Sequence, residues 1–201
     1  RTKLSENLFE GLAPWLQKLP GGLIHVNVVG CALFAAISGS SAATVATVGK
    51  MSIPELRKRK YPEKILLGSL AGSGTLGLLI PPSIILIIYG VTVQESIAKL
   101  FIAGIIPGIM IALIFMSYVI VWSLLNKNKM PSNNEKFSFL HKLSKSKQLI
   151  PVILLILGVI GSIYTGIATA TEAASLGVVG ALILSYFQKS LNLKTFKDSL
   201  L

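Results

Sequence analysis

Hydrophobic residues along this chain form long runs separated by short polar segments. Residues 97–125 form the clearest run, and a helix that crosses the apolar core of a membrane needs about 20 residues. Further runs cover 65–90, 149–168 and 171–187. Because so many long apolar runs are not expected in a soluble domain, the pattern predicts an all-α membrane protein built from transmembrane helices.

Residues 1–22 carry a different pattern. Leucines recur at helical spacing up to Trp15, with charged residues between them. The stretch is too polar to cross a membrane. We therefore expect an amphipathic helix that lies at the membrane interface and is anchored there by Trp15.

The apolar residues 23–49 are interrupted at their centre by Ser38-Gly39-Ser40-Ser41. Each apolar arm beside this sequence is too short to cross a membrane alone. Ser-Gly-Ser-Ser favours a turn and a helix N-cap over a helix centre. The pattern therefore predicts a re-entrant helical hairpin with its tip at these residues, and a single long tilted helix is the alternative.

Residues 65–90 carry a second interruption, at Pro81-Pro82. Neither proline has an amide donor, and Pro81 disfavours helical geometry at Ile80. Region 65–125 is therefore predicted to hold a broken helix, made of two half-helices and an unwound segment, followed by a transmembrane helix. Discontinuous helices of this kind point to a transporter site near the middle of the membrane.

Two shorter motifs bear on packing. Gly104 and Gly108 are four residues apart on one predicted helix, which permits close packing against another helix. Thr169-x-x-Glu172 predicts a capping box at the start of the last helix, and we favour that structural role over a functional one for Glu172.

Charge adds an orientation to this picture. The chain has 201 residues, of which 52% are hydrophobic and 13% charged, with a net charge of +11. The basic residues gather in three segments, 50–64, 126–148 and 188–201, which we interpret as a cytoplasmic loop, a cytoplasmic linker and the start of another cytoplasmic segment. Two crossings in 65–125 and two in 149–187 would place all three on one side. The charge thus indicates membrane topology rather than nucleic-acid binding.

Helix ends at the two interruptions suggest the chemistry of the site. Two N-termini, after Ser41 and at Pro82-Ser83, favour an anion such as a carboxylate. Two C-termini, near Ser38 and near Gly77, favour a hard cation such as Na⁺. Side-chain oxygens come from Ser40, Ser41, Thr44 and Thr75. Neither 23–49 nor 65–90 contains Lys, Arg, Asp or Glu, so recognition here would use dipoles and neutral groups.

Four sequences in register resemble the large membrane subunit, of the DctM type, of tripartite ATP-independent periplasmic (TRAP) transporters. They are Gly21-Gly-Leu-Ile-His-Val-Asn27 with Ala36-Ile-Ser-Gly-Ser-Ser-Ala-Ala-Thr44, Gly74-Thr-Leu-Gly-Leu-Leu-Ile-Pro-Pro-Ser83, Lys99-Leu-Phe-Ile-Ala-Gly-Ile-Ile-Pro-Gly108 and Thr171-Glu-Ala-Ala-Ser-Leu-Gly177. The resemblance runs from about residue 4 to about residue 187. One departure is Ala170, which stands where the family usually has proline and puts the stiffness of that turn in doubt.

The resemblance implies one half of an inverted-repeat, elevator-type importer in the bacterial inner membrane, with several membrane passes. It implies Na⁺ as the coupling ion and no other cofactor, a small membrane subunit of the DctQ type, and a periplasmic binding protein that delivers an organic acid. A C4-dicarboxylate is our expectation, because the sequence around Ser38–Thr44 is closer to dicarboxylate members than to sialic-acid members. We also expect the chain to be part of a longer protein whose second half completes the site.

By the same resemblance, eight residues are candidates for the site. The expected Na⁺ contacts are Ser38, Gly39, Ser40, Gly77 and Pro81, and the expected substrate contacts are Ser41, Thr44 and Ser83.

Three other functions remain as alternatives. The strongest is another Na⁺- or H⁺-coupled carboxylate symporter that needs no binding protein. A passive channel or scaffold is the second. The third is an intramembrane enzyme with Ser40 or Ser41 as nucleophile, but the only intramembrane base, His25, lies more than three helical turns from Ser40 in the sequence. We therefore expect no enzymatic activity.

Overall fold

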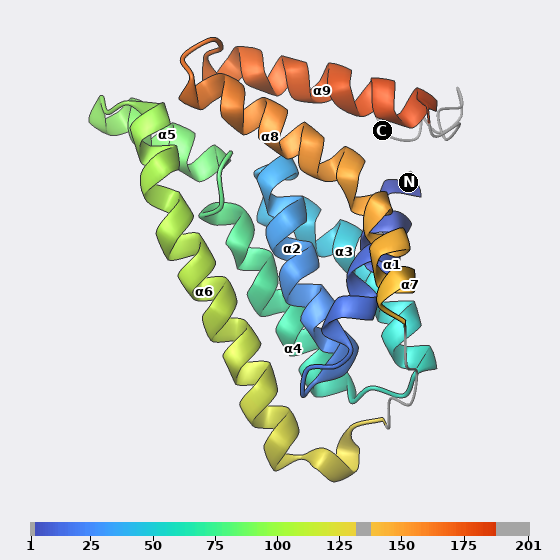
Figure 1. Cartoon of the computed structure of the whole chain (residues 1–201). Coiled ribbons are helices and arrows are strands. Elements are labelled where there is room, and N and C mark those ends of the chain that lie inside the picture. Colours follow the sequence, from blue (N-terminus) through green and yellow to red (C-terminus); the bar gives the residue numbers. More distant parts are fainter. Residues whose placement is uncertain (1–2, 132–137, 188–201) are drawn as a thin grey trace.

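The computed structural model describes residues 3–131 and 138–187, and all regular structure in this part of the chain is helical (Figure 1). The α-helices are α1 (Lys3–Leu16), α2 (His25–Ser38), α3 (Ser41–Lys58), α4 (Glu63–Gly74), α5 (Ile84–Val93), α6 (Ile97–Leu125), α7 (Phe139–Ser146), α8 (Ile150–Tyr164) and α9 (Ala170–Phe187). Short 3₁₀ turns cover Gly22–Ile24, Thr75–Leu78, Lys127–Lys129 and Lys147–Leu149.

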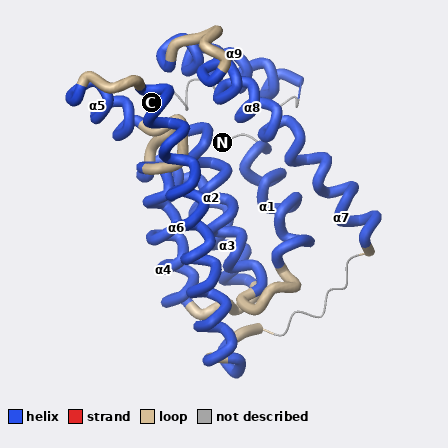
Figure 2. The backbone as a smooth tube through the Cα atoms, turned by 60° about the vertical axis from the view of Figure 1, so that its left-hand side comes forward, coloured by secondary structure: helices blue, strands red, loops and turns tan. Residues whose placement is uncertain are grey.

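Helices α2, α3 and α4 pack against one another at the centre of the fold. Helix α6 runs along one side of this group, and α1 and α7 lie on the other (Figures 1 and 2). Helices α8 and α9 form an antiparallel pair across the end where α2 finishes. Both interruptions foreseen in the sequence therefore lie at one end of the central group, beneath this pair.

The main hydrophobic core lies where α1, α2, α3, α4 and α6 meet. Its fully buried members include Leu8, Ile24, Leu56, Leu66 and Val119. Leu8 lies on the apolar face of α1, so the predicted amphipathic pattern does form a helix, over Lys3–Leu16. That face packs into the core of this chain.

The segment 126–148, which we expected to be a linker, contains helix α7, and α7 docks on α1. The Nε1 atom of Trp15 donates a hydrogen bond to Ser146 Oγ at 2.7 Å, and Lys142 Nζ lies 5.2 Å from the centroid of the Trp15 ring. Lys145 forms an ion pair with Glu10, which lowers the pKa of that carboxyl. Trp15, expected as a membrane anchor, is therefore also a contact between two helices.

Helix α3 is longer than predicted. The basic segment 50–64 was expected to be a loop, but the helix continues through Lys58. Buried Val48, Ser52 and Leu56 recur at helical spacing, so the face that packs on α2 and α4 extends beyond the apolar run. Burial on one face thus outweighs the basic composition of the other.

Both short motifs singled out in the sequence are present in the structure. The capping box is confirmed: Thr169 N donates to Glu172 Oε2 at 2.8 Å, and Glu172 N donates to Thr169 Oγ1 at 3.4 Å. The close packing expected at Gly104 and Gly108 is also present: the neighbours are Leu79 and Ile80 of the unwound segment after α4, and Leu86 of α5.

Candidate functional site

The first interruption is a tight turn between α2 and α3. Gly39 adopts a left-handed conformation with φ of +60°, and its amide donates to Ala35 O at 3.0 Å, which closes the end of α2. Ser40 is extended, and its Oγ accepts a hydrogen bond from Ala43 N at 3.5 Å, as an N-cap of α3. The predicted turn at Ser38–Ser41 is therefore present, and only its placement in a membrane stays a prediction.

The second interruption separates α4 from α5. After the 3₁₀ turn that follows α4, the amides of Leu79 and Ile80 both donate to Leu76 O, at 3.1 and 2.8 Å. The backbone is then unwound until α5 begins at Ile84, with Ser83 extended before it. Pro81 and Pro82 have no amide donors, so this segment leaves few donors unpaired. The predicted broken helix is therefore present.

The two interruptions are in direct contact. The amide of Ile84 donates to Gly39 O at 3.3 Å, which joins the start of α5 to the hairpin turn. A Cβ atom placed on Gly39 would lie 2.6 Å from Pro82 O. A Cβ atom on Gly77 would lie 2.8 Å from Ser41 N and 2.9 Å from Ser40 C. Only glycine at these two positions lets the backbones approach this closely.

The polar side chains at this junction differ in their hydrogen-bond partners. Thr44 is fully buried, and its Oγ1 lies 2.9 Å from Ser38 Oγ. Ser41 Oγ is buried and has no hydrogen-bond partner. Ser83 is fully buried, and its Oγ donates to Leu78 O at 2.6 Å. Ser41 therefore offers a hydroxyl with no competing protein partner, whereas those of Thr44 and Ser83 are already engaged.

Thr75 stands at the start of the 3₁₀ turn that follows α4. Its side chain is exposed, and its Oγ1 donates to Gly72 O at 2.7 Å, one turn back on the same helix. A threonine near a helix end commonly bonds to its own backbone in this way. The hydroxyl thus donates its proton to its own backbone and keeps its lone pairs, so a role for Thr75 as an oxygen ligand stays a prediction.

The five expected Na⁺ contacts lie on the two interruptions that meet here: Ser38, Gly39, Ser40, Gly77 and Pro81. Gly39 O accepts from Ile84 N, and Ser40 O accepts from Thr44 N at 3.0 Å. A carbonyl oxygen has two lone pairs. Gly39 O therefore retains one for a cation, whereas Ser40 O also accepts a hydrogen bond from Ser38 Oγ at 3.4 Å and has both engaged. Within the described residues, no three His, Cys, Asp or Glu side chains form a metal cluster. A cation here would bind neutral oxygens, which hard cations accept.

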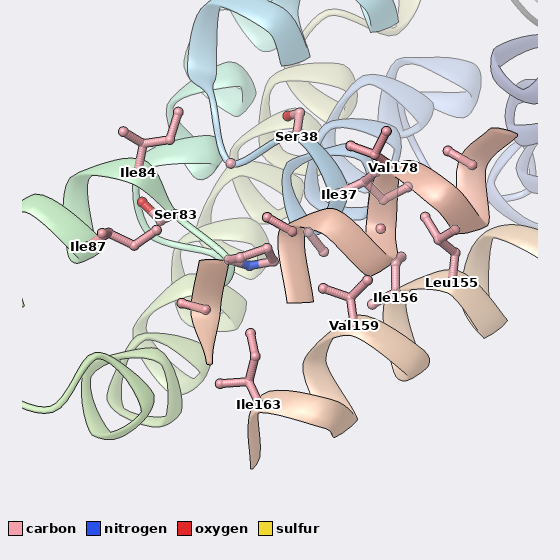
Figure 3. A pocket seen from close by; sticks show the side chains of 17 residues that line it. Ile37, Ser38, Ser83, Ile84, Ile87, Leu155, Ile156, Val159, Ile163 and Val178 are labelled. Atoms are coloured by element: carbon pink, nitrogen blue, oxygen red, sulfur yellow. The ribbon is translucent and has the colours of Figure 1, made fainter. Parts of the chain in front are cut away.

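A cavity of about 320 Å³ adjoins the junction (Figure 3). Ser38, Gly39 and Ser83 line one side of it. Its other wall is apolar and comes from α8 and α9, with Ile156, Val159, Ile163, Ala174, Gly177 and Val178 among its members. Of the three expected substrate contacts, only Ser83 lines this cavity.

The α8–α9 wall and the packing of Gly104 against the second interruption were not predicted from the sequence. Neither could be read from the pattern, because the apolar residues of α8 and α9 resemble any membrane-helix residues until the tertiary arrangement places them. The spacing of Gly104 and Gly108 indicated close packing, but it did not indicate the partner.

Comparison with known proteins identifies relatives of the whole chain. The family described as "Tripartite ATP-independent periplasmic transporter, DctM component" matches residues 1–201. The C4-dicarboxylate TRAP transporter large permease protein DctM of Pseudomonas aeruginosa is 38% identical over 167 residues, which cover 83% of this chain and 38% of that protein.

Relatives with other substrates in their names are equally similar. The isethionate TRAP transporter permease protein DctMQ of Oleidesulfovibrio alaskensis is 38% identical over 200 residues, covering 97% of this chain and 31% of that protein. The sialic acid TRAP transporter permease protein SiaT of Haemophilus influenzae is 38% identical over 199 residues, covering 98% and 32%. The chain thus spans less than half the length of each of these relatives.

Proposed function

We infer that this chain, which belongs to the DctM component family of the tripartite ATP-independent periplasmic transporters, contributes half of a Na⁺-coupled transport site for an organic acid. The family consists of transporter components rather than enzymes. As part of a large permease subunit in the bacterial inner membrane, the chain would act with a small membrane subunit and a periplasmic binding protein. These partners follow from family membership and are part of the proposal.

The contact between the two interruptions is the observation that carries this proposal. Helices α3 and α5 begin at the junction, while α2 and the turn after α4 end there. N-terminal amides favour an anionic group of the substrate, and C-terminal carbonyls favour Na⁺. The junction thus brings groups that favour an anion and groups that favour a cation into one region. Neither 23–49 nor 65–90 contributes a charged side chain to it.

A placement across a membrane is supported by two helical stretches of the described chain that are long and apolar enough to cross one, Ile97–Leu125 and Lys142–Tyr164. Large apolar side chains are exposed along the length of α6, including Ile102, Ile106, Met110, Leu113, Tyr118 and Val121. Such a surface suits lipid or another membrane helix rather than water.

The orientation proposed from charge is supported by part of the arrangement, although helix α7 of the basic segment 126–148 lies beside α1 instead. The basic end of α3, the start of α4 and the lysines after α6 all lie at the lower end of the fold in Figures 1 and 2. The site lies toward the opposite end. We assign the basic end to the cytoplasm by the positive-inside rule.

A C4-dicarboxylate is the substrate we propose, on the resemblance of Ser38–Thr44 to dicarboxylate members. Relatives named for C4-dicarboxylate, isethionate, sialic acid and ectoine are all similar to this chain. Family membership alone therefore does not select a substrate.

The test uses the full-length subunit with its small partner in proteoliposomes. A binding protein loaded with radiolabelled dicarboxylate, isethionate or sialic acid is added outside, with or without an inward Na⁺ gradient. We expect dicarboxylate uptake that needs both the binding protein and the gradient. Uptake with Na⁺ but without the binding protein would instead indicate a simpler symporter. Uptake that neither saturates nor depends on Na⁺ would refute the proposal.

A further inference from the structure

The unwound segment between the turn after α4 and the start of α5, residues 79–83, is held from two sides. On one side it meets the hairpin turn, where Pro82 O faces Gly39 and Ile84 N donates to Gly39 O. On the other side it meets α6 at two glycines one turn apart, Gly104 and Gly108, both buried. The position of the segment is therefore set jointly by the hairpin and by α6.

The contact at Gly104 is with the backbone. A Cβ atom placed there would lie 2.8 Å from Leu79 O and 3.1 Å from Leu86 Cδ1. A carbonyl oxygen cannot rotate away as a side chain can, so a methyl group at this position must shift the segment. A shift toward the hairpin is opposed by close packing there, because Pro82 O lies only 2.6 Å from the position that a Cβ of Gly39 would occupy.

The contact at Gly108 is mainly with a side chain. A Cβ atom there would lie 2.9 Å from Ile80 Cγ1, while the nearest backbone atom of Ile80 is 3.8 Å away. A methyl group at Gly108 could therefore be relieved by shortening Ile80. A methyl group on Gly104 would thus displace backbone of the segment, whereas one on Gly108 would displace a side chain. Comparing the two alanine variants separates these effects.

We propose that Gly104 and Gly108 are positioning residues for the Na⁺ site: α6 seats the unwound segment so that Pro81 and Gly77 keep their places against the hairpin turn. This inference rests on the proposed function, and it adds a helix that carries none of the candidate ligands. It also accounts for the packing of this glycine pair against the unwound segment, through Leu79 O at Gly104 and the Ile80 side chain at Gly108.

The test measures the Na⁺ concentration for half-maximal uptake in the full-length complex, together with thermal unfolding in NaCl and in choline chloride. Gly104→Ala should raise the half-saturating Na⁺ concentration by about tenfold or more, because an inserted methyl displaces backbone at the site. It should also reduce the extra thermal stability that Na⁺ gives the wild type. Gly68→Ala is the matched control, because a Cβ on this glycine of α4 would meet nothing within 4 Å.

A rescue experiment keeps the inference testable if Gly104→Ala does not fold. Gly108→Ala should weaken Na⁺ dependence less than Gly104→Ala, and adding Ile80→Ala should bring the half-saturating Na⁺ concentration back to within about twofold of wild type, since it removes the atom that clashes. Ile80→Ala should not rescue Gly104→Ala. A merely structural defect would lower the maximum rate and the yield without changing Na⁺ dependence.

The outcomes distinguish a failure of the proposed function from a failure of the positioning role. If wild-type uptake does not depend on Na⁺, the proposed function is wrong. If wild-type uptake depends on Na⁺ and both glycine variants keep the wild-type half-saturation, the positioning role is wrong while the proposed function stands.

Discussion

Gly77 gives the sharpest test of the junction between the hairpin and the broken helix. Any side chain on Gly77 would enter backbone, because its Cβ would lie 2.8 Å from Ser41 N, 2.9 Å from Ser40 C and 3.0 Å from Ser41 Cα. Ordinary contacts need at least about half an ångström more, and overpacking of this kind costs about 1–3 kcal/mol. Because the displaced atoms belong to the site, a shift of this size could reduce transport by about 100-fold.

We therefore expect Gly77→Ala to lower uptake strongly and Gly77→Val, with two further methyl groups, to abolish it. The assay is radiolabelled uptake in proteoliposomes, with the amount of inserted subunit measured by immunoblot and monodispersity checked in detergent. Gly158→Ala serves as the control, because a Cβ on this glycine of α8 would meet nothing within 4 Å. Uptake at the wild-type rate by Gly77→Val would refute the close approach of the two interruptions.

Three further predictions follow from single contacts. Ser41→Ala should reduce uptake at least about tenfold without lowering the melting temperature, because its buried hydroxyl has no protein partner to lose; unchanged uptake would remove Ser41 from the site. Lys145→Gln should cost no more than about 1 kcal/mol, since the Glu10 side chain is half exposed. Because the pKa of Glu10 is lowered, the ion pair stabilises the fold above the ordinary carboxyl pKa of 4.5. This stabilisation is lost as the pH falls through the lowered pKa, so variant and wild type should have the same melting temperature there. Glu172→Ala should lower the melting temperature by removing the capping box, whereas Glu172→Gln should retain most of it; equal losses would show that charge matters more than the hydrogen bonds.

The two interruptions could be predicted because they depend on local chemistry. Glycine in a left-handed turn at Gly39, an N-cap at Ser40 and two donor-free prolines act within a few residues of their own positions. Their effects therefore appear in the sequence whatever packs around them. The capping box at Thr169 and Glu172 was predictable for the same reason.

Elements that depend on tertiary contact were predicted less well. Helix α3 continues into the basic segment because Ser52 and Leu56 are buried by neighbours that the local sequence does not identify. Helix α7 lies in the expected linker, where it is paired with α1 by residues about 130 positions away, as in the hydrogen bond from Trp15 to Ser146. Long-range contacts of this kind have no local signature.

In the candidate site, too, features set by local sequence were predictable and features set by tertiary contacts were not. The helix ends that meet there were foreseen, since each follows from an interruption. The state of each hydroxyl was not foreseen: Ser83 bonds to Leu78 O, Thr75 turns back to Gly72, and Ser41 alone among these three is buried without a partner. Hydrogen-bond competition is set by atomic positions, so residue type alone could not rank them.

The most direct test of the central claim measures Na⁺ and substrate movement in the same proteoliposomes. The full-length subunit and its small partner would be supplied with ²²Na⁺ and with dicarboxylate on its binding protein. We predict Na⁺ influx that requires substrate, substrate influx that requires Na⁺, and loss of both in Gly77→Val. Substrate uptake that continues at the same rate when choline replaces Na⁺ on both sides of the membrane would contradict it.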